Sequence, residues 1–381
     1  MVKPASETEL AEIVRQGGSF EICGSASKRR LGRHAPQEQV LDMSGFSGVA
    51  LYEPDELMLE AGSATPLAEI ERLLAQNAQQ LAFEPPDYAR LLGVNGRGTL
   101  GGMISCALAG PRRIKAGGPR DHVLGFSGVS GRGEVFKAGG RVVKNVTGFD
   151  ISKLMVGAFG TLVALSRITL KVLPAAETEE TLVLQGLSDT RAVEAMSLAM
   201  QSSCEVSGAS HLPGSRTLLR LEGVRPSVTY RRDKLAALLK AFGAVEIIPE
   251  KLSRATWKDI GDVAALADED QRQVWKLSVA PSHSSAIIAK LQSQLDIRYI
   301  MDWAGGLIWL SVPAAPDASA SIIRRSFSSG HATLMRASDE VRSQVEVFQP
   351  QNAALHALSA RVKTAFDPKA LFNPGRMYQD I

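Results

Sequence analysis

The sequence TLGGMIS at residues 99–105 places two adjacent glycines between two hydroxyl side chains, those of Thr99 and Ser105. Adjacent glycines provide a wall without side chains, against which a flat ring or a pyrophosphate can lie closely. Pro85-Pro86-Asp87 precedes this stretch and Ala109-Gly110 follows it. The stretch therefore predicts one wall of a ligand-binding cleft.

A second loop of small residues lies upstream, where residues 24–28 read GSASK. The preceding residues Phe20, Ile22 and Cys23 alternate with polar ones, which predicts a short strand running into the loop. Successive backbone N–H groups of small residues bind phosphate well, and Lys28 adds a positive charge. By itself, such a loop is structural more often than it is a binding site.

A third glycine-rich region reads GGRVVKNVTGFD at 139–150 and GAFGTL at 157–162. The two clusters flank a short predicted helix that begins near Asp150, so its N-terminus and the next turn would face the adenosine half of a cofactor. The sequence GVNGRG at 93–98 has the reverse order of the nicotinamide fingerprint and no clean strand before it, so it does not predict a Rossmann site.

In their order along the chain, these motifs resemble the flavoprotein superfamily of vanillyl-alcohol oxidase and the D-lactate dehydrogenases. Within it, CALAGPRR at 106–113, GGRVVKNVTGFD at 139–150 and LMVGAFGTL at 154–162 are similar to the FAD-binding E subunits of glycolate oxidase. The resemblance covers about residues 15–174 and returns in FDPKALFNPGRM at 366–377. Agreement of four ordered segments is specific.

The resemblance implies non-covalent FAD, because no histidine or cysteine matches the family's covalent attachment position. It implies that residues 24–28 hold the pyrophosphate and that Gly160 and Val163 contact the adenosine side. Asn373 and Arg376 would approach the flavin from the tail. The complete set of expected FAD-binding residues is Gly24, Ser25, Ala26, Ser27, Lys28, Asp87, Thr99, Gly101, Gly102, Ser105, Gly160, Val163, Asn373 and Arg376.

One departure from the family concerns catalysis. Relatives that oxidise D-2-hydroxy acids carry an H-x-G-D-G-N-x-H segment, whereas the comparable residues 302–309 here read DWAGGLIW and hold no histidine. No general base is visible, so the catalytic residues stay unknown. The resemblance favours an FAD-binding subunit of a glycolate oxidase complex, in which a homologous catalytic flavoprotein oxidises a small 2-hydroxy acid and an iron-sulfur subunit receives electrons. The alternatives are a stand-alone FAD-dependent 2-hydroxy-acid dehydrogenase and a flavin-free assembly subunit.

Composition is that of an ordinary globular protein, with 45% hydrophobic and 22% charged residues. The net charge of +3 falls short of a nucleic-acid-binding signature. Three cysteines and six histidines show no metal-ligand spacing, so we expect no metal site. The N-terminal sequence lacks the apolar core of a signal peptide, and no apolar stretch approaches the length of a membrane span. We therefore expect a cytoplasmic protein that meets a membrane only peripherally, through the complex.

Local patterns predict several elements. Ser6 and Glu9 form a capping-box pattern for a helix over 6–16. Thr65 is expected to cap a helix that starts at Pro66, with Leu67, Ile70, Leu74 and Leu81 on one face. Further helices are expected over 232–242 and 284–295, and Leu355, Leu358, Val362 and Phe366 mark one face of a helix near the C-terminus.

The length of 381 residues favours more than one domain. We expect an α+β fold with a PCMH-type FAD-binding domain of two α+β subdomains over residues 1–174. An α+β cap domain with an antiparallel sheet would span 175–345, and residues 346–381 would return to the FAD-binding domain.

Overall fold

The computed structural model describes residues 1–140, 149–268 and 271–381. Its first large sheet has five antiparallel strands in the order β3-β4-β8-β6-β7. These strands are β3 (Val49–Glu53), β4 (Met58–Gly62), β8 (Val163–Lys171), β6 (Val123–Ser130) and β7 (Val135–Gly139). The predicted motif at 139–150 falls largely on residues 141–148, which lie outside the described residues.

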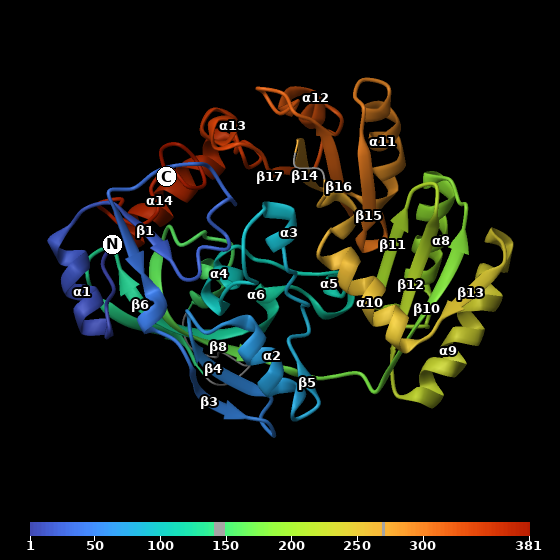
Figure 1. The fold of residues 1–381 in the computed structure, drawn as a ribbon, viewed down its shortest axis with the longest axis horizontal. Coiled ribbons are helices and arrows are strands. Elements are labelled where there is room, and N and C mark those ends of the chain that lie inside the picture. The colour runs from blue at the N-terminus through green and yellow to red at the C-terminus, as the bar shows by residue number, and fades with distance from the viewer. Residues whose placement is uncertain (141–148, 269–270) are drawn as a thin grey trace.

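The second large sheet has eight antiparallel strands in the order β13-β10-β12-β11-β15-β16-β14-β17, and it lies beside the first (Figure 1). The strands are β13 (Val245–Ile248), β10 (Thr178–Gln185), β12 (Arg216–Gly223), β11 (Gly208–Leu212), β15 (Arg298–Asp302), β16 (Leu307–Pro313), β14 (Arg272–Ser278) and β17 (His331–Arg336).

The two faces of the eight-stranded sheet are buried against different partners, because successive side chains on a strand point to opposite faces. Trp275, Leu277 and Ile308 join a core with the helices that cover the outer face. Val274 and Trp309 point the other way and join the core of the five-stranded sheet. The second sheet therefore presents one face to the N-terminal half of the chain.

Helices cover these sheets and connect their strands, and most of them are short. In the N-terminal half they are α1 (Glu7–Gln16), α2 (Leu67–Ala75), α3 (Ala89–Leu92), α4 (Leu100–Ser105), α5 (Arg113–Ala116), α6 (Pro119–His122) and α7 (Ser152–Met155). In the remainder they are α8 (Asp189–Gln201), α9 (Arg225–Leu238), α10 (Glu250–Gly261), α11 (Ser284–Gln292), α12 (Ala320–Arg325), α13 (Asp339–Gln344) and α14 (Ala353–Phe366).

The C-terminal segment returns to the N-terminal elements. Strand β1 (Phe20–Cys23) pairs in parallel with β2 (Gln39–Asp42). Phe20 also forms a bridge with Phe372, and the Lys363 ammonium on α14 donates to the Phe372 carbonyl oxygen. Two two-residue strands, β5 (Gln79–Gln80) and β9 (Leu173–Pro174), complete the strands. No helix of the described residues is long and apolar enough to cross a membrane.

The prediction for α1 and β1 is confirmed. Ser6 caps α1 by accepting a hydrogen bond from the Glu9 backbone N–H, and the Glu9 carboxylate accepts one from the Ala5 backbone N–H. The predicted strand at Phe20 is β1. The tail helix is also present as α14, although Leu355 and Leu358 on its predicted apolar face are exposed.

The prediction that Thr65 caps α2 is wrong. The Thr65 hydroxyl is buried and bonded to the backbone N–H and C=O of Gly48, so it is not available to the helix. Helix α2 begins at Leu67 and has no side-chain cap. It ends at Ala75, so Leu81 does not belong to it and follows β5 instead.

Three further predicted helices have different boundaries. Helix α9 starts at Arg225, with a proline in its first turn, and the segment 239–242 is a 3₁₀-helix. Helix α11 ends at Gln292 rather than at residue 295. The helix expected near Asp150 begins at Ser152, whose hydroxyl donates to the Asp150 carboxylate.

Candidate functional site

A cleft lies where β1, α4, β8 and the C-terminal tail meet, and we call it the central cleft. All of the expected FAD-binding residues except Asp87 line it. The predicted residues on its walls are Gly24, Ser25, Ala26, Ser27, Lys28, Thr99, Gly101, Gly102, Ser105, Gly160, Val163, Asn373 and Arg376. Segments that are distant along the chain thus converge on one site.

The loop after β1 forms one end of the central cleft. Ala26 adopts a left-handed backbone conformation with φ of 59°. The backbone N–H groups of Ser25, Ser27 and Lys28 donate no hydrogen bond to any residue within the described ranges. The Lys28 ammonium donates to the Arg97 carbonyl oxygen at 3.0 Å, and burial lowers its pKa. Open N–H groups beside a positive charge suit an anionic phosphate.

Helix α4 forms the glycine wall. Thr99 caps the helix by accepting a hydrogen bond from the Gly102 backbone N–H. The Gly101 backbone N–H donates to the Ser63 carbonyl oxygen at 2.6 Å, and a Cβ on Gly101 would lie 2.9 Å from that oxygen. Gly101 is therefore required by the close approach of another backbone segment as well as by the flat wall.

The tail closes the opposite side of the central cleft. The Asn373 side chain accepts a hydrogen bond from the Ile22 backbone N–H at 3.0 Å and donates one to the Phe159 carbonyl at 2.8 Å. Arg376 donates through Nη2 to the carbonyl oxygens of Lys28 and Arg29. These bonds join the 24–28 loop, the turn at 157–162 and the tail into one rim.

Two buried polar atoms on the walls of the central cleft lack a hydrogen-bond partner within the described structure, and they show that the cleft suits a polar ligand. They are the hydroxyl of Ser63 and Nε of Arg376, and both residues line the cleft. Burial also lowers the pKa of Arg376. Unpartnered buried polar groups are costly without a ligand or water. Together with the open N–H groups of the loop, they fit a pyrophosphate-bearing cofactor.

Asp87 lies outside the set of cleft-lining residues. Its carboxylate accepts a hydrogen bond from the Ala89 backbone N–H, and its own N–H donates to Asp262. It therefore fixes the turn into α3. The sequence reasoning did not select Cys23, Ser63, Cys106 and Phe159, which also line the cleft. Phe159 and Cys106 lie inside the quoted segments 157–162 and 106–113, and Cys23 directly precedes the 24–28 loop, so position in or beside a motif was the available signal for these three, whereas Ser63 lies in none of the motifs.

A second cavity of about 260 Å³ adjoins the central cleft, and we call it the sheet-face cavity. Cys106 and Phe159 line both. Its other walls include Arg113 from α5 and Lys276, Trp303 and Thr333 from the eight-stranded sheet and the turn after β15. The cavity thus lies between the central cleft and the inner face of that sheet.

Ionisable groups in and beside this cavity have strongly shifted pKa values. Burial, with Arg113 nearby, lowers the pKa of Lys276 to about 8. Asp302 is 2% exposed, and burial raises its pKa to about 7. Burial also raises the pKa of the Cys106 thiol to about 11, which leaves little thiolate at neutral pH. Perturbed groups of this kind gather at functional sites.

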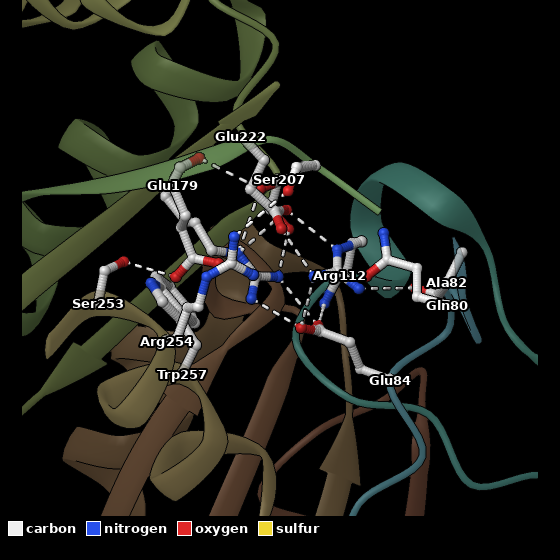
Figure 2. A network of polar contacts seen from close by, with 12 residues as sticks. Gln80, Ala82, Glu84, Arg112, Glu179, Ser207, Glu222, Ser253, Arg254 and Trp257 are labelled. Carbon is white, nitrogen blue, oxygen red and sulfur yellow. Dashed lines mark hydrogen bonds and ion pairs between the residues drawn. The ribbon is translucent and has the colours of Figure 1, made fainter. Parts of the chain in front are cut away.

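A buried polar network joins the eight-stranded sheet to the N-terminal half (Figure 2). Arg220 on β12 donates to both carboxylate oxygens of Glu84, at 2.7 and 2.9 Å. Arg112 donates to both oxygens of Glu222, at 3.0 and 2.7 Å. Figure 2 shows Arg112 between the carboxylates of Glu84 and Glu222. Two crossed, bidentate pairs thus join the segments around 84 and 112 to β12.

Comparisons with known proteins agree with this geometry. The family model described as an FAD binding domain matches residues 1–139. Glycolate oxidase subunit GlcE of Escherichia coli (strain K12) is 33% identical over 360 residues, which cover 94% of this chain and 93% of that protein. This chain belongs to the GlcE family. The expected resemblance and the expected FAD cofactor are thereby confirmed.

Other relatives of this GlcE-family chain include a second type of glycolate oxidase subunit, a D-lactate dehydrogenase and an FAD-linked oxidoreductase. Glycolate oxidase subunit GlcD of Bacillus subtilis (strain 168) is 25% identical, over 96% of this chain and 83% of that protein. A D-lactate dehydrogenase of Anaerostipes hadrus is 27% identical over 48% of this chain and 38% of its own length. The GlcE family therefore belongs to a larger group of FAD-linked oxidoreductases.

The fold of the GlcE-family chain matches solved structures along almost its entire length. A structure of alkyldihydroxyacetonephosphate synthase superposes with a TM-score of 0.65, covering 98% of this chain and 76% of that one. At 14% sequence identity this likeness concerns the fold alone. The α+β fold expected from the sequence, with a PCMH-type FAD-binding domain and antiparallel sheets, is confirmed.

Proposed function

We propose that this GlcE-family chain is the FAD-binding subunit of a glycolate oxidase complex. In that complex a homologous catalytic flavoprotein subunit oxidises glycolate to glyoxylate, and an iron-sulfur subunit receives the electrons. The observation that carries the proposal is the convergence of the predicted FAD-binding segments on the central cleft. The similarity to GlcE and GlcD supports the complex.

Different residues of the central cleft would bind different parts of FAD. The open N–H groups of residues 24–28 would hold the pyrophosphate, and the wall at Gly101 and Gly102 would lie against the flavin or its linker. When bound, FAD supplies a two-electron acceptor for the oxidation of an alcohol. Asn373 and Arg376 would orient the cofactor from the tail, and the protein would hold it non-covalently.

The proposal includes a division of labour along the chain. Residues 1–174 and the returning segment 346–381 would form the FAD-binding domain, and residues 175–345 would form the cap domain. Lys363 supports this division, because its ammonium donates to the carbonyl oxygens of Thr161 and Phe372. We propose that the chain works in the cytoplasm, in contact with a membrane only through its complex.

The experiment is purification of the full chain, alone and with tagged partner subunits. We expect a yellow protein with flavin absorbance bands, whose flavin is released into solution when the protein is precipitated with acid. We also expect stable co-purification with a homologous flavoprotein and an iron-sulfur protein. A colourless chain would contradict the FAD assignment, and a yellow chain that assembles with neither partner would contradict the role in a complex.

A further inference from the structure

Two cations of the sheet-face cavity have no anionic partner. The Arg113 guanidinium carbon lies 4.9 Å from the ring centre of Trp303. The Lys276 ammonium lies 5.3 Å from that same ring and 5.8 Å from the Trp309 ring. Neither side chain forms a hydrogen bond or an ion pair with any residue in the described part of the chain. Both cations are therefore held on one indole without charge neutralisation.

Such an arrangement favours the binding of an anion in the cavity. Like charges near one another raise the free energy of both, and burial of Lys276 removes water that would otherwise solvate its ammonium, whereas Arg113 is exposed. The effect is visible in the lowered pKa of Lys276, which burial and Arg113 produce together. Contact with an aromatic ring stabilises a cation by only about 0.5–2 kcal/mol.

The charge of the cavity walls has one sign. Among the described residues that line the cavity there is no aspartate or glutamate. Asp302 is the acidic residue that acts on the charge of Lys276, but it is buried and does not line the cavity. Its carboxylate accepts a hydrogen bond from the Trp303 backbone N–H at 2.8 Å. Its carboxyl has a pKa of about 7, raised by burial, so half of the population is neutral near that pH. The cavity is thus positive on its accessible side.

The size of the cavity limits its occupant. A volume of about 260 Å³ exceeds the roughly 10–15 Å³ that one water molecule needs by this measure, so a small organic anion fits. The rings of Phe159 and Phe348 meet edge to face at 4.9 Å on one wall, and Leu334 and Met335 add further apolar surface. The Thr333 hydroxyl is a polar group that can bond a ligand hydroxyl.

We propose that the sheet-face cavity binds a small carboxylate of the 2-hydroxy-acid class, held by Arg113 and Lys276. A guanidinium matches the two oxygens of a carboxylate, and the ammonium of Lys276 neutralises the remaining charge. The shared walls at Cys106 and Phe159 place this acid next to the central cleft. That the acid is a substrate rests on the proposed function, whereas its binding does not.

This inference gives the chain an acid-binding site of its own. The catalytic subunit of the proposed complex is then not the only subunit that recognises the acid. Arg113 and Lys276 act here as binding residues, and the site can be measured without any turnover.

The test measures the affinity of the purified full chain for oxalate by isothermal titration calorimetry. Oxalate is a dicarboxylate that cannot be oxidised as an alcohol. Quenching of Trp303 fluorescence, taken as the difference between the parent chain and Trp303→Phe, reports the same event. We expect Arg113→Met and Lys276→Met each to weaken oxalate binding at least tenfold. Lys115→Met is the matched control, because Lys115 is an exposed cation on the same helix, and it should leave the affinity within twofold.

Further measurements distinguish misfolding of a variant from a specific loss of oxalate binding. Lys276→Arg keeps the charge and should bind oxalate within a few fold of the parent, which would show that a loss in Lys276→Met is not caused by misfolding. Glycolamide, which is uncharged, should not compete. Equal affinity of the parent chain for oxalate and for inorganic phosphate would overturn the carboxylate assignment. Unchanged oxalate binding in both methionine variants would overturn the site.

Flavin content measured on the same samples keeps this proposal distinct from the proposed function. A colourless chain that binds oxalate through Arg113 and Lys276 would refute the FAD-binding role and support the acid site. A yellow chain that does not bind oxalate would support the FAD-binding role and refute the acid site.

Discussion

At the scale of single residues, the adjacent glycines of α4 have different roles although they are indistinguishable in the sequence. A Cβ on Gly101 would meet the Ser63 side chain and carbonyl oxygen, both at 2.9 Å. A Cβ on Gly102 would make only ordinary contacts, at 3.5 Å from the Thr99 hydroxyl and 3.7 Å from Lys28 Cγ. Gly101 is thus constrained by packing, and Gly102 by the open space that it leaves in the central cleft.

We therefore expect opposite phenotypes from substitutions at these glycines. Gly102→Leu should fold normally and lose most of its FAD, because its side chain occupies the cleft. Gly101→Ala should lower the thermal unfolding midpoint, because backbone atoms near residue 63 must shift. The ratio of flavin to protein absorbance and a thermal melt measure both effects. A yellow Gly102→Leu protein would count against the cleft as the FAD site.

Asp302 makes stability depend on pH. Burial raises its pKa from 3.8 to about 7, so the folded protein holds the proton more tightly than the unfolded chain between those values. The free energy of unfolding contributed by this group therefore falls as the pH rises through that window. In Asp302→Asn this dependence disappears. From pH 4 to pH 8 the variant should gain up to about 4 kcal/mol relative to the parent in urea denaturation. A constant difference would contradict the assignment.

Lys276 makes binding depend on pH. Because its pKa is about 8, its ammonium is present below that value and is lost as the pH rises past it. Oxalate affinity should fall by up to tenfold per pH unit above about 8. Arg113 and His331 line the same cavity, and ionisation of Asp302 near pH 7 adds to the loss. Calorimetry in Lys276→Arg should show a much shallower fall, and an identical fall would exclude Lys276 as the titrating group.

At the scale of elements, α14 and the C-terminal tail are held against the N-terminal residues that line the central cleft. Lys363 is 5% exposed and donates to the Thr161 and Phe372 carbonyl oxygens and to the Asp367 carboxylate, all within 2.9 Å. Asp367 in turn accepts from the backbone N–H groups of Leu371 and Phe372. The position of Asn373 and Arg376 in the central cleft depends on this arrangement.

Removing the Lys363 ammonium should loosen the attachment of the C-terminal tail. Lys363→Met leaves the buried Asp367 carboxylate without its cation, which costs about 3–5 kcal/mol for a buried ion pair. We expect a loss of stability of this order and faster proteolysis of the tail. Lys369→Met, an exposed cation on the same segment, should change neither. Equal stability of the two variants in urea would show that the buried bonds do not hold the tail.

At the scale of the whole molecule, the network in Figure 2 holds the eight-stranded sheet against the N-terminal half. Arg220 is 1% exposed and lies 4.8 Å from the Trp257 ring centre. Burial opposes the charge on Glu222, but Arg220 and Arg112 lower the pKa of its carboxyl to about 2. The sheet-face cavity has a wall from each half, with Arg113 next to Arg112 on one side and Lys276 on the other. Its geometry therefore depends on this network.

Arg220→Met should destabilise the protein by about 3–5 kcal/mol, because Glu84 and Glu222 lose a shared cation. Adding Glu84→Gln should recover part of that loss, since one uncompensated carboxylate is removed. Arg191→Met, which breaks an exposed pair with Glu194, should cost less than about 1 kcal/mol. Urea denaturation measures all of these, and a cost of Arg220→Met equal to that of Arg191→Met would refute a structural role for the network.

The sequence alone determined the features that depend on neighbours along the chain. The capping box of α1, the strand before residue 24, the glycine wall at 101 and 102 and the tail motif at 366–377 are all local patterns. Backbone conformation and helix capping depend on a few neighbouring residues, so these features can be predicted from the local sequence. The resemblance of these ordered motifs to a known family then predicted the fold and the cofactor.

Only the tertiary structure decided where side chains find distant partners. Thr65 matches the pattern of a helix cap but bonds to Gly48, and Asp87, predicted to contact the cofactor, accepts a hydrogen bond from the Ala89 backbone N–H at the start of α3. Arg113 ends the segment CALAGPRR, which assigns it no role, and Lys276 belongs to no motif, so they become a site only because the eight-stranded sheet brings both to one indole ring. The physical reason is that burial and charge pairing are set by non-local packing, which no local pattern encodes.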